Sequence, residues 1–193
     1  GRLKMQASVL GYFVHEKVER FEARPDKAVA TPAFFGSFKV LKNHDLSVRA
    51  FYKRMFRMPT FNDLYYTDMG NAFLKPEYAE QFNVGLKYTR NFEKSPFMRM
   101  LDVSVDAYYN KITDKIIAYP KGQQFRWTML NLGEVEIKGV DAVLNALFTL
   151  GKLEVTTKFQ YTYQKAIDIT DPADTYYRDQ IPYIPWHSGS AIL

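Results

Sequence analysis

Hydrophobic and polar residues alternate along most of the chain. Every second residue is apolar or aromatic over residues 3–13, 46–52, 82–88, 101–109 and 140–148, and also over 153–163 except at Thr157. Weaker series lie at 33–42 and from Ser188 onward. Successive side chains of a β-strand point to opposite faces of a sheet, so each segment has one apolar and one polar face. The pattern predicts an all-β chain, an antiparallel meander of about eight long strands.

A helix is the alternative for one segment only, "KPEYAEQFNVGLKY" at residues 75–88. Pro76 would suit the first turn of a helix. Gly85 lowers helix propensity, and the alternation after Gln81 has the period of a strand. We therefore expect a strand here, with at most one helical turn before it.

The predicted strands and connections have informative lengths. Several strands run over about 10–15 residues, longer than usual in soluble sheets and close to the length of a tilted membrane-crossing strand. Short connections at 42–45, 91–96 and 150–152 alternate with long ones at about 15–32, 56–78, 112–126 and 165–186. Short turns at one end and long loops at the other are typical of outer-membrane β-barrels. The alternative is a soluble β-sandwich whose Tyr-rich loops bind carbohydrate or protein, with the apolar faces packed on a second sheet.

Composition narrows the classes of function. The chain has 14 Tyr, 15 Phe and 2 Trp, which favour strands, ligand-binding surfaces and the aromatic girdles of membrane proteins. The formal charge of +5 is small and dispersed, so we expect no nucleic-acid partner. The lack of cysteine excludes a disulfide framework and cysteine-based sites. The chain ends in mid-pattern at Leu193, and we expect it to be a piece of a longer protein.

Five sequence elements carry a family resemblance. In order they are "FRMPTFNDLYY" with "GNAFLKPE", then "VDAYYNKITDKII", "MLNLGEVEIKGVDAVL", "LEVTTKFQYTYQKAIDIT" and "QIPYIPWHS". Together they span about residues 33–190, and over this range the chain resembles the C-terminal half of the TonB-dependent outer-membrane transporters. The spacing is most similar to the cobalamin transporters of that family, although siderophore and haem receptors share the same frame.

The resemblance implies a fold, a location and a function. Residues 1–193 would be a partial barrel domain, about eight strands of a 22-stranded barrel without its plug domain and final strands. The protein would lie in the bacterial outer membrane and import a cobalamin or a ferric siderophore, with energy from TonB acting through the N-terminal region. Outer-membrane lipid and a surface-exposed accessory lipoprotein would be further partners. No cofactor and no enzymatic activity are implied.

The resemblance and the loop lengths together imply an orientation. Strands from Leu46, Leu101 and Leu153 would ascend to external loops, and strands from Gln81, Thr128 and Ser188 would descend. The apolar face would meet lipid, where a charge near the midplane costs about 2–4 kcal/mol. The polar face would line the lumen with Arg49, Lys53, Lys87, Asp102, Asp106, Asp141, Glu154, Lys158 and Gln160. An isolated sheet would expose two edges and its apolar face, and we expect self-association, detergent or refolding into a smaller closed or two-layer form to hide them.

Two groups of residues are candidates for ligand contact. The first lies in the predicted loop 56–78, where tyrosine and phenylalanine offer rigid contact area with a polar handle. It consists of Phe61, Asn62, Asp63, Tyr65 and Tyr66. The alternative is structural: the rings pack the loop onto the barrel rim, Pro59 fixes the turn, and Arg57 pairs inside the barrel.

The second group is Tyr176, Tyr177 and Arg178, at the external end of a descending strand. By the resemblance to cobalamin-type transporters, Arg178 is the residue we expect to contact the ligand. The alternative is an exposed salt bridge from Arg178 to Asp179 or Asp174.

Metal and catalytic sites find little support. Asp168, Asp171 and Asp174 lack the glycine and bidentate glutamate of a calcium loop, so a solvated acidic loop is expected. His15, His44 and His187 have no second ligand at metal spacing. Asp102 and Asp106 would lie about 13 Å apart on one strand face, too far for a glycosidase pair. The sequence contains no nucleophile elbow, phosphate loop or dinucleotide-binding turn.

Overall fold

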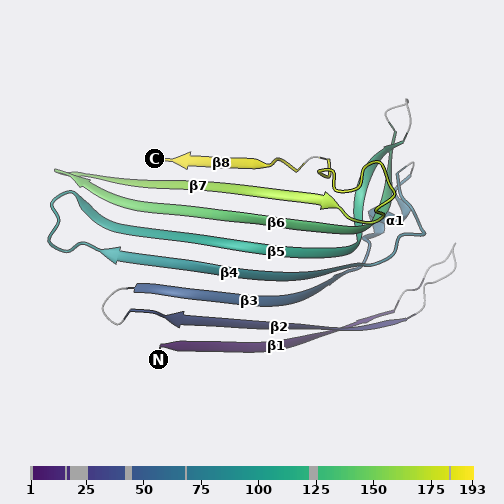
Figure 1. Ribbon diagram of the computed structural model, residues 1–193, viewed down its shortest axis with the longest axis horizontal. Coiled ribbons are helices and arrows are strands. Elements are labelled where there is room, and N and C mark those ends of the chain that lie inside the picture. The colour runs from purple at the N-terminus through teal and green to yellow at the C-terminus, as the bar shows by residue number, and fades with distance from the viewer. Residues whose placement is uncertain are drawn as a thin grey trace.

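The protein is an antiparallel meander of eight strands in a single sheet, as the sequence predicts (Figure 1). A computed structural model describes residues 2–15, 17, 26–41, 45–67, 69–121, 126–182 and 184–193, so the predicted loop histidine His44 lies outside the described residues. Each strand pairs with its neighbours in sequence. The strands are β1 Leu3–Val14, β2 Lys27–Lys39, β3 Asp45–Arg57, β4 Glu77–Asn91, β5 Met98–Lys121, β6 Arg126–Leu150, β7 Leu153–Asp168 and β8 His187–Ile192, and a short helix, α1 Phe61–Tyr65, follows β3.

All eight strands lie in one layer, and β1 and β8 form the two edges of the sheet (Figure 1). A β-sandwich needs a second sheet packed on the first, so the sandwich alternative is wrong for the described part of the chain. The sheet is also open, so of the three expected ways to hide its apolar face, refolding into a smaller closed or two-layer form is not seen in the described part of the chain.

The three short turns and two of the four long connections lie where the sequence predicts them. The turns before β3, β5 and β7 are short, and Gly151 (φ 63°) supplies the left-handed conformation that the β6–β7 turn needs. The β3–β4 and β7–β8 connections are long and lie at the opposite end of the sheet, beside α1 (Figure 1). Among the described residues there is no helix long and apolar enough to cross a membrane.

The predicted loop at 112–126 is wrong, because both strands continue through it. β5 and β6 remain paired as far as Lys121 and Arg126. The alternation is broken at Asp114, which has φ 54° and lies outside the ladder, and the hairpin bends away from the sheet in this region (Figure 1). Asp tolerates the left-handed region better than most residues, so the strand can bend there without ending.

The predicted loop at 15–32 is too long in the same way. β2 begins at Lys27 and pairs with β1 throughout, from Lys27 opposite Val14. Pro32, which reads as a strand breaker, stands just before the pairing of β2 with β3 begins at Ala33 opposite Lys53. The strand therefore tolerates proline near the end of its pairing with β3.

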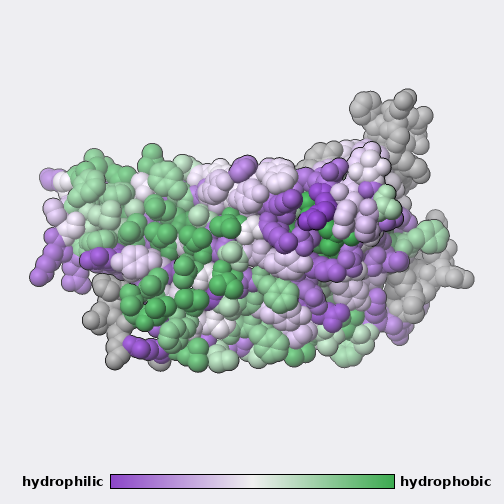
Figure 2. Space-filling view, in the orientation of Figure 1, coloured by the Kyte–Doolittle hydropathy of each residue, from purple (hydrophilic) through white to green (hydrophobic). Residues whose placement is uncertain are grey.

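Burial is concentrated at the end of the sheet that carries the long connections. One cluster comprises Ala79, Ile112, Val135, Ile137, Ala166 and Ile181. A second comprises Leu64, Leu74 and Ile116, and it fixes α1 and the β3–β4 connection to β5. Over the rest of the sheet apolar side chains remain exposed, among them Leu86 at 52% and Val105 at 41%. In Figure 2, hydrophobic residues gather over the half of the strands toward the short turns, and hydrophilic residues gather at the end near α1.

Candidate functional site

The polar face of the sheet, which carries Arg49, Asp106 and Asp141, is a network of paired side chains. Arg49 on β3 donates from Nε to Asp106 Oδ1 on β5 at 3.0 Å, and its guanidinium makes a second bond to Oδ2. Lys87 forms a salt bridge of 3.2 Å with Asp102. Thr162 donates to Asp141 at 2.7 Å. Arg49, Lys87, Asp102 and Asp106 therefore form two ion pairs on this face of the wall.

The apolar face, which carries Val48, Leu86 and Val105, has a row of aromatic rings in direct register. Phe34, Tyr52, Phe82 and Tyr109 are register partners across β2–β5. The centroids of successive rings in this row lie 6.5, 4.9 and 6.3 Å apart. Aromatic side chains favour the boundary between hydrocarbon and water, so this row marks such a boundary.

A band without charges begins at this aromatic row and extends toward the short turns. On the apolar face of β4 it runs from Phe82 to Tyr88, between Glu80 and Arg90. On β5 it runs from Leu101 to Tyr109, between Arg99 and Lys111. A charge-free band bounded by aromatic rings and then by charges is the lipid-facing surface of a barrel strand.

The β3–β4 connection begins with a capped helix. Thr60 is the N-cap of α1 and its hydroxyl accepts from the Asp63 N–H at 3.2 Å, while the Asp63 carboxylate accepts from the Thr60 N–H at 2.9 Å. This reciprocal pair is a capping box. The prediction of a loop without a helix at this point is wrong, and the missed signal is the Thr-x-x-Asp spacing of Thr60 and Asp63.

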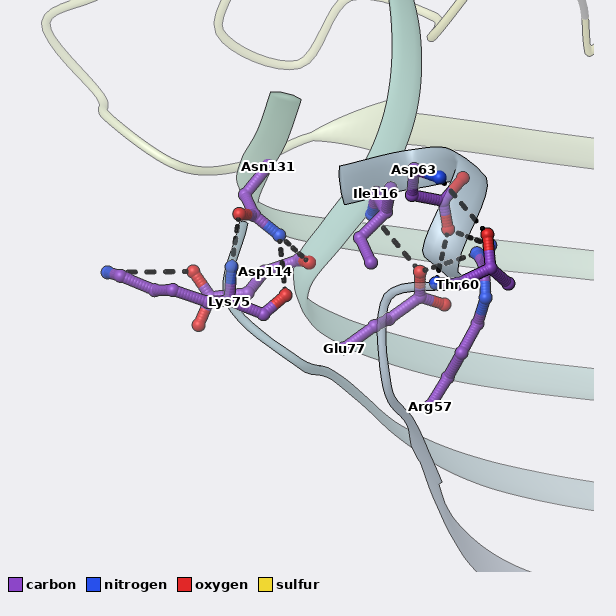
Figure 3. Close-up of polar contacts among 8 residues, drawn as sticks. All are labelled: Arg57, Thr60, Asp63, Lys75, Glu77, Asp114, Ile116 and Asn131. Carbon is purple, nitrogen blue, oxygen red and sulfur yellow. Dashed lines mark hydrogen bonds and ion pairs between the residues drawn. The ribbon is translucent and has the colours of Figure 1, made fainter. Parts of the chain in front are cut away.

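Arg57 connects both ends of this connection (Figure 3). It forms salt bridges of 3.1 Å with Asp63 and 3.6 Å with Glu77. Glu77 in turn accepts from the N–H of Ile116 on β5 at 3.1 Å. The structural alternative for Arg57 therefore holds, and Asp63, whose side chain is only 12% exposed, is engaged in the cap and the salt bridge.

Asn131 fixes the second half of the connection to the β5–β6 hairpin (Figure 3). Its amide nitrogen donates to the carbonyls of Lys75 at 3.1 Å and Asp114 at 2.7 Å, and its oxygen accepts from the Lys75 N–H at 2.8 Å. Asn71 adds a bond to the Met129 carbonyl at 3.0 Å. Sequence reasoning missed both asparagines, because the bonds that join the two segments, from Asn71 to Met129 and from Asn131 to Lys75, span 58 and 56 residues.

The remaining residues of the first candidate group differ in how far they are exposed to solvent. The Phe61 side chain is 73% exposed and Tyr66 is 59% exposed. Asn62 is exposed, whereas Tyr65 is half-buried and packs its ring 5.1 Å from that of Phe61. The structure thus brings these rings together on α1 and presents Phe61 to the outside.

In the second candidate group Tyr176 is 69% exposed, Tyr177 is half-buried and Arg178 is exposed. The backbone of Arg178 has φ 67° and donates to the Asp168 carbonyl at 2.7 Å. The positive charge of Arg178 affects the pKa of Glu136, which lies on β6 beyond the charge-free band. Lys138 lowers the pKa of Glu136, and Tyr109 and Arg178 act in the same direction. Within the described part of the chain Arg178 makes no salt bridge with Asp174 or Asp179.

The three aspartates of the acidic loop each support a local turn. Asp168 accepts from the Thr170 N–H at 2.8 Å, Asp171 from Ala173 at 2.9 Å and Asp174 from Tyr176 at 2.9 Å. Two of the three histidines are described: His15 contacts Asp26 at 2.6 Å, and His187 contacts the Tyr161 hydroxyl at 2.8 Å. Over the described ranges no group of three acidic or histidine side chains is placed to hold a metal ion.

The single antiparallel sheet has ion pairs on its polar face and a charge-free band bounded by aromatic rings on the other face, and its long connections gather at one end. These are the features of the wall of a transmembrane β-barrel. The sequence profile of the family described as "TonB dependent receptor-like, beta-barrel" matches residues 12–193. The chain belongs to this family, and it is a protein of the bacterial outer membrane. The family consists of transporters and receptors.

Two curated relatives are vitamin B12 transporters. BtuB of Vibrio vulnificus is 34% identical over 99 residues, which cover 51% of this chain and 14% of the relative. BtuB of Photobacterium profundum is 34% identical over 113 residues, which cover 55% of this chain and 16% of the relative. The match thus spans less than a fifth of the length of either relative.

Proposed function

We propose that this chain is part of an outer-membrane transporter that binds a cobalamin-type ligand at its external end and imports it with energy supplied by TonB. The observation that carries the proposal is the 34% identity to two vitamin B12 transporters within a shared barrel family. Ferric siderophores are the competing ligand class within the same family frame.

The external end of the sheet offers a surface suited to a large ligand with an apolar body and a polar edge. Phe61, Tyr66 and Tyr176 present exposed rings, and Asn62 and Tyr177 add hydrogen-bonding groups near them in sequence. The connection that carries Phe61 is held by Arg57 and Asn131, so its rings are positioned before a ligand arrives. Preorganised aromatic contacts lose little conformational entropy on binding.

We propose that Arg178 contacts the ligand, as the resemblance to cobalamin transporters implies. Lys138 lowers the pKa of Glu136 on the apolar face, and the positive charge of Arg178 adds to that effect. Arg178 is exposed, so a ligand that approaches from above the rim reaches it. We further propose that a surface-exposed lipoprotein would meet these same external connections.

The test is a fluorescence titration of the intact parent transporter in detergent, with cyanocobalamin and then with a ferric siderophore. Trp127 and Trp186 lie at the external end and report on ligand there. We expect saturable quenching by cyanocobalamin alone, weakened in Phe61→Ala and unchanged in Lys4→Gln, whose lysine lies on the polar face of β1 at the other end. Quenching by the siderophore alone would reject the cobalamin assignment.

A further inference from the structure

A row of uncharged residues crosses the polar face of the sheet next to the ion pair of Arg49 and Asp106. Both members of that pair are register neighbours of Gly85, and the next residue of β3 on the same face toward the external end is Phe51. Phe51 belongs to a continuous series of register partners from β2 to β7, here called the lumenal row. Its members are Phe35, Phe51, Asn83, Tyr108, Gly139 and Gln164. The row thus places three aromatic rings on a face that is otherwise polar.

Two hollows in the polar face meet at Phe51. One has a volume of about 280 Å³, and Phe35 and Lys53 are also in its lining. The other has a volume of about 320 Å³, and Asp141 is its charged residue. Four carboxamides line this second hollow: Gln81, Asn83, Asn110 and Gln164. Aromatic rings offer apolar contact and carboxamides both donate and accept hydrogen bonds, so the row suits an occupant with an apolar body and neutral polar groups at its edge.

One hydrogen-bonding group of the lumenal row has no partner. Asn83 Oδ1 is buried and accepts no hydrogen bond from the described residues. Polar groups close to it are bonded: the Tyr108 hydroxyl donates to Gln164 at 3.2 Å, and Asp141 accepts from Thr162 at 2.7 Å. A buried carbonyl oxygen without a donor is costly, and native structures normally supply one. An occupant that brings an N–H or O–H group to Asn83 therefore removes this cost.

An apolar ledge lies between the lumenal row and the external connections. On the same face, toward the external end, it consists of Ala79, Ile112, Val135, Ile137, Ala166 and Ile181. The β7–β8 connection is fixed on it, because the Ile181 N–H donates to the Ala166 carbonyl at 2.9 Å and the Gln180 side chain accepts from the Ala166 N–H at 3.0 Å. The row and the exposed rings of the external connections are therefore separate surfaces.

We propose that the lumenal row is a second contact site for the transported ligand, which the ligand reaches only after it has left the external connections. This inference rests on the proposed function, because its occupant is the same cobalamin-type ligand. The reason for this occupant is chemical likeness, since the external connections and the row both combine aromatic rings with neutral hydrogen-bonding side chains. Phe35, Phe51 and Tyr108 contact the apolar body of the ligand, and Asn83 Oδ1 accepts a hydrogen bond from its polar edge.

The experiment is photocrosslinking of the intact parent transporter in cells, with p-benzoylphenylalanine in place of Phe51. Radiolabelled cyanocobalamin is added, and cells with and without TonB are irradiated. We expect label on the transporter only when TonB is present, because passage beyond the external end requires TonB in the proposed function. The same group in place of Phe61 should take label in both strains. In place of Tyr52, which is adjacent to Phe51 but on the apolar face, it should take none.

A kinetic measurement separates this site from the external one. Phe51→Ala should lower the maximal rate of cyanocobalamin uptake by about tenfold, since burial of a phenylalanine ring contributes about that factor or more. The Kd of the variant in detergent should stay unchanged, whereas Phe61→Ala should raise it. Folding is checked by heat-modifiable migration on gels, and Phe35 replaces Phe51 in both measurements if the variants at Phe51 do not fold.

Four outcomes would overturn the inference. Label at the position of Phe61 but not at that of Phe51, in folded transporters with TonB, would remove the second site and leave the proposed function standing. Equal label at Phe51 without TonB would make the row part of the external site. A crosslink from this position to another segment of the polypeptide, with no ligand attached, would show that the row holds protein instead. No label at either position would reject the proposed function together with this inference.

Discussion

Arg49 and Asp106 form an ion pair across a strand that lies between them. Arg49 is on β3 and Asp106 on β5, and both are register neighbours of Gly85 on β4. A Cβ on Gly85 would lie 2.1 Å from Asp106 Oδ1 and 3.0 Å from Arg49 Nε. The glycine therefore provides the space through which the two side chains meet, and the pair links three strands of the polar face.

Gly85→Ala should destabilise the transporter by about 1–2 kcal/mol, because the methyl group displaces a pair that is only partly shielded from water. The measurement is urea-induced unfolding of the intact protein in detergent. Gly36→Ala is the matched control, since a Cβ there meets nothing within 4 Å, and we expect no loss of stability. Equal effects of the two substitutions would contradict the role assigned to Gly85.

A second glycine lies beneath an aromatic ring. Tyr108 on β5 crosses Gly139 on β6 and donates to Gln164 on β7 at 3.2 Å, and a Cβ on Gly139 would lie 2.3 Å from the Tyr108 hydroxyl oxygen. Gly139→Ala should therefore cost more than about 1 kcal/mol of unfolding free energy in the wild-type background and clearly less in Tyr108→Ala. Part of the cost remains in the double variant, because the Tyr163 carbonyl is also close. Additive effects would contradict the ring contact.

Asn131→Ala should loosen the β3–β4 connection without unfolding the barrel. It removes two donated bonds and one accepted bond that hold Lys75 and Asp114 together. Hydrogen exchange of the Lys75 amide should become at least about tenfold faster, in line with the loss of more than one hydrogen bond. Asn62→Ala, at an exposed position on α1, should leave this amide unchanged. Unchanged exchange in Asn131→Ala would show that other contacts hold the connection.

The sequence predicted the strands and their faces well, because the alternation of side chains reports directly on the two environments of a barrel wall. The series at 82–88 and 101–109, for example, lie within β4 and β5, on the expected faces. The alternation failed where environments change along a strand, as at Asp114, where the hairpin bends, and at β2, where Pro32 reads as a break.

The contacts of the external end could be predicted only in part. The capping box of Thr60 and Asp63 is local, so its spacing was available in the sequence although it was missed. The bonds of Asn131 depend on register between distant strands, which a single sequence does not contain. The structure shows where each residue of the two candidate groups lies. The contact of these residues with ligand stays a prediction.

The lipid-facing assignment of the apolar face can be tested on two adjacent residues of β5. Val105→Lys should destabilise the barrel by about 2–4 kcal/mol, because it places a charge in the lipid-facing band. Ser104→Lys, on the polar face between Asp102 and Asp106, should cost far less. Urea unfolding in lipid vesicles measures both. A larger effect at Ser104 than at Val105 would reverse the assignment of faces.

Phe61 and Asp63 should differ in how they affect ligand binding. Phe61→Ala removes an exposed ring and should weaken cyanocobalamin binding by at least about fivefold, with unchanged hydrogen exchange across α1. Asp63→Ala should speed exchange of the Leu64 amide first, because it removes half of the capping box and a partner of Arg57. Loss of binding in Asp63→Ala with exchange unchanged would indicate direct contact of the carboxylate with ligand.

Uptake of radiolabelled cyanocobalamin by intact cells tests the central claim most directly. The parent transporter would be expressed in cells that lack their own cobalamin transporter, with TonB present or deleted. We predict saturable uptake that requires both the transporter and TonB and that excess ferric siderophore does not inhibit. Uptake that is absent in cells with the folded transporter in the outer membrane and TonB present would contradict the proposed function.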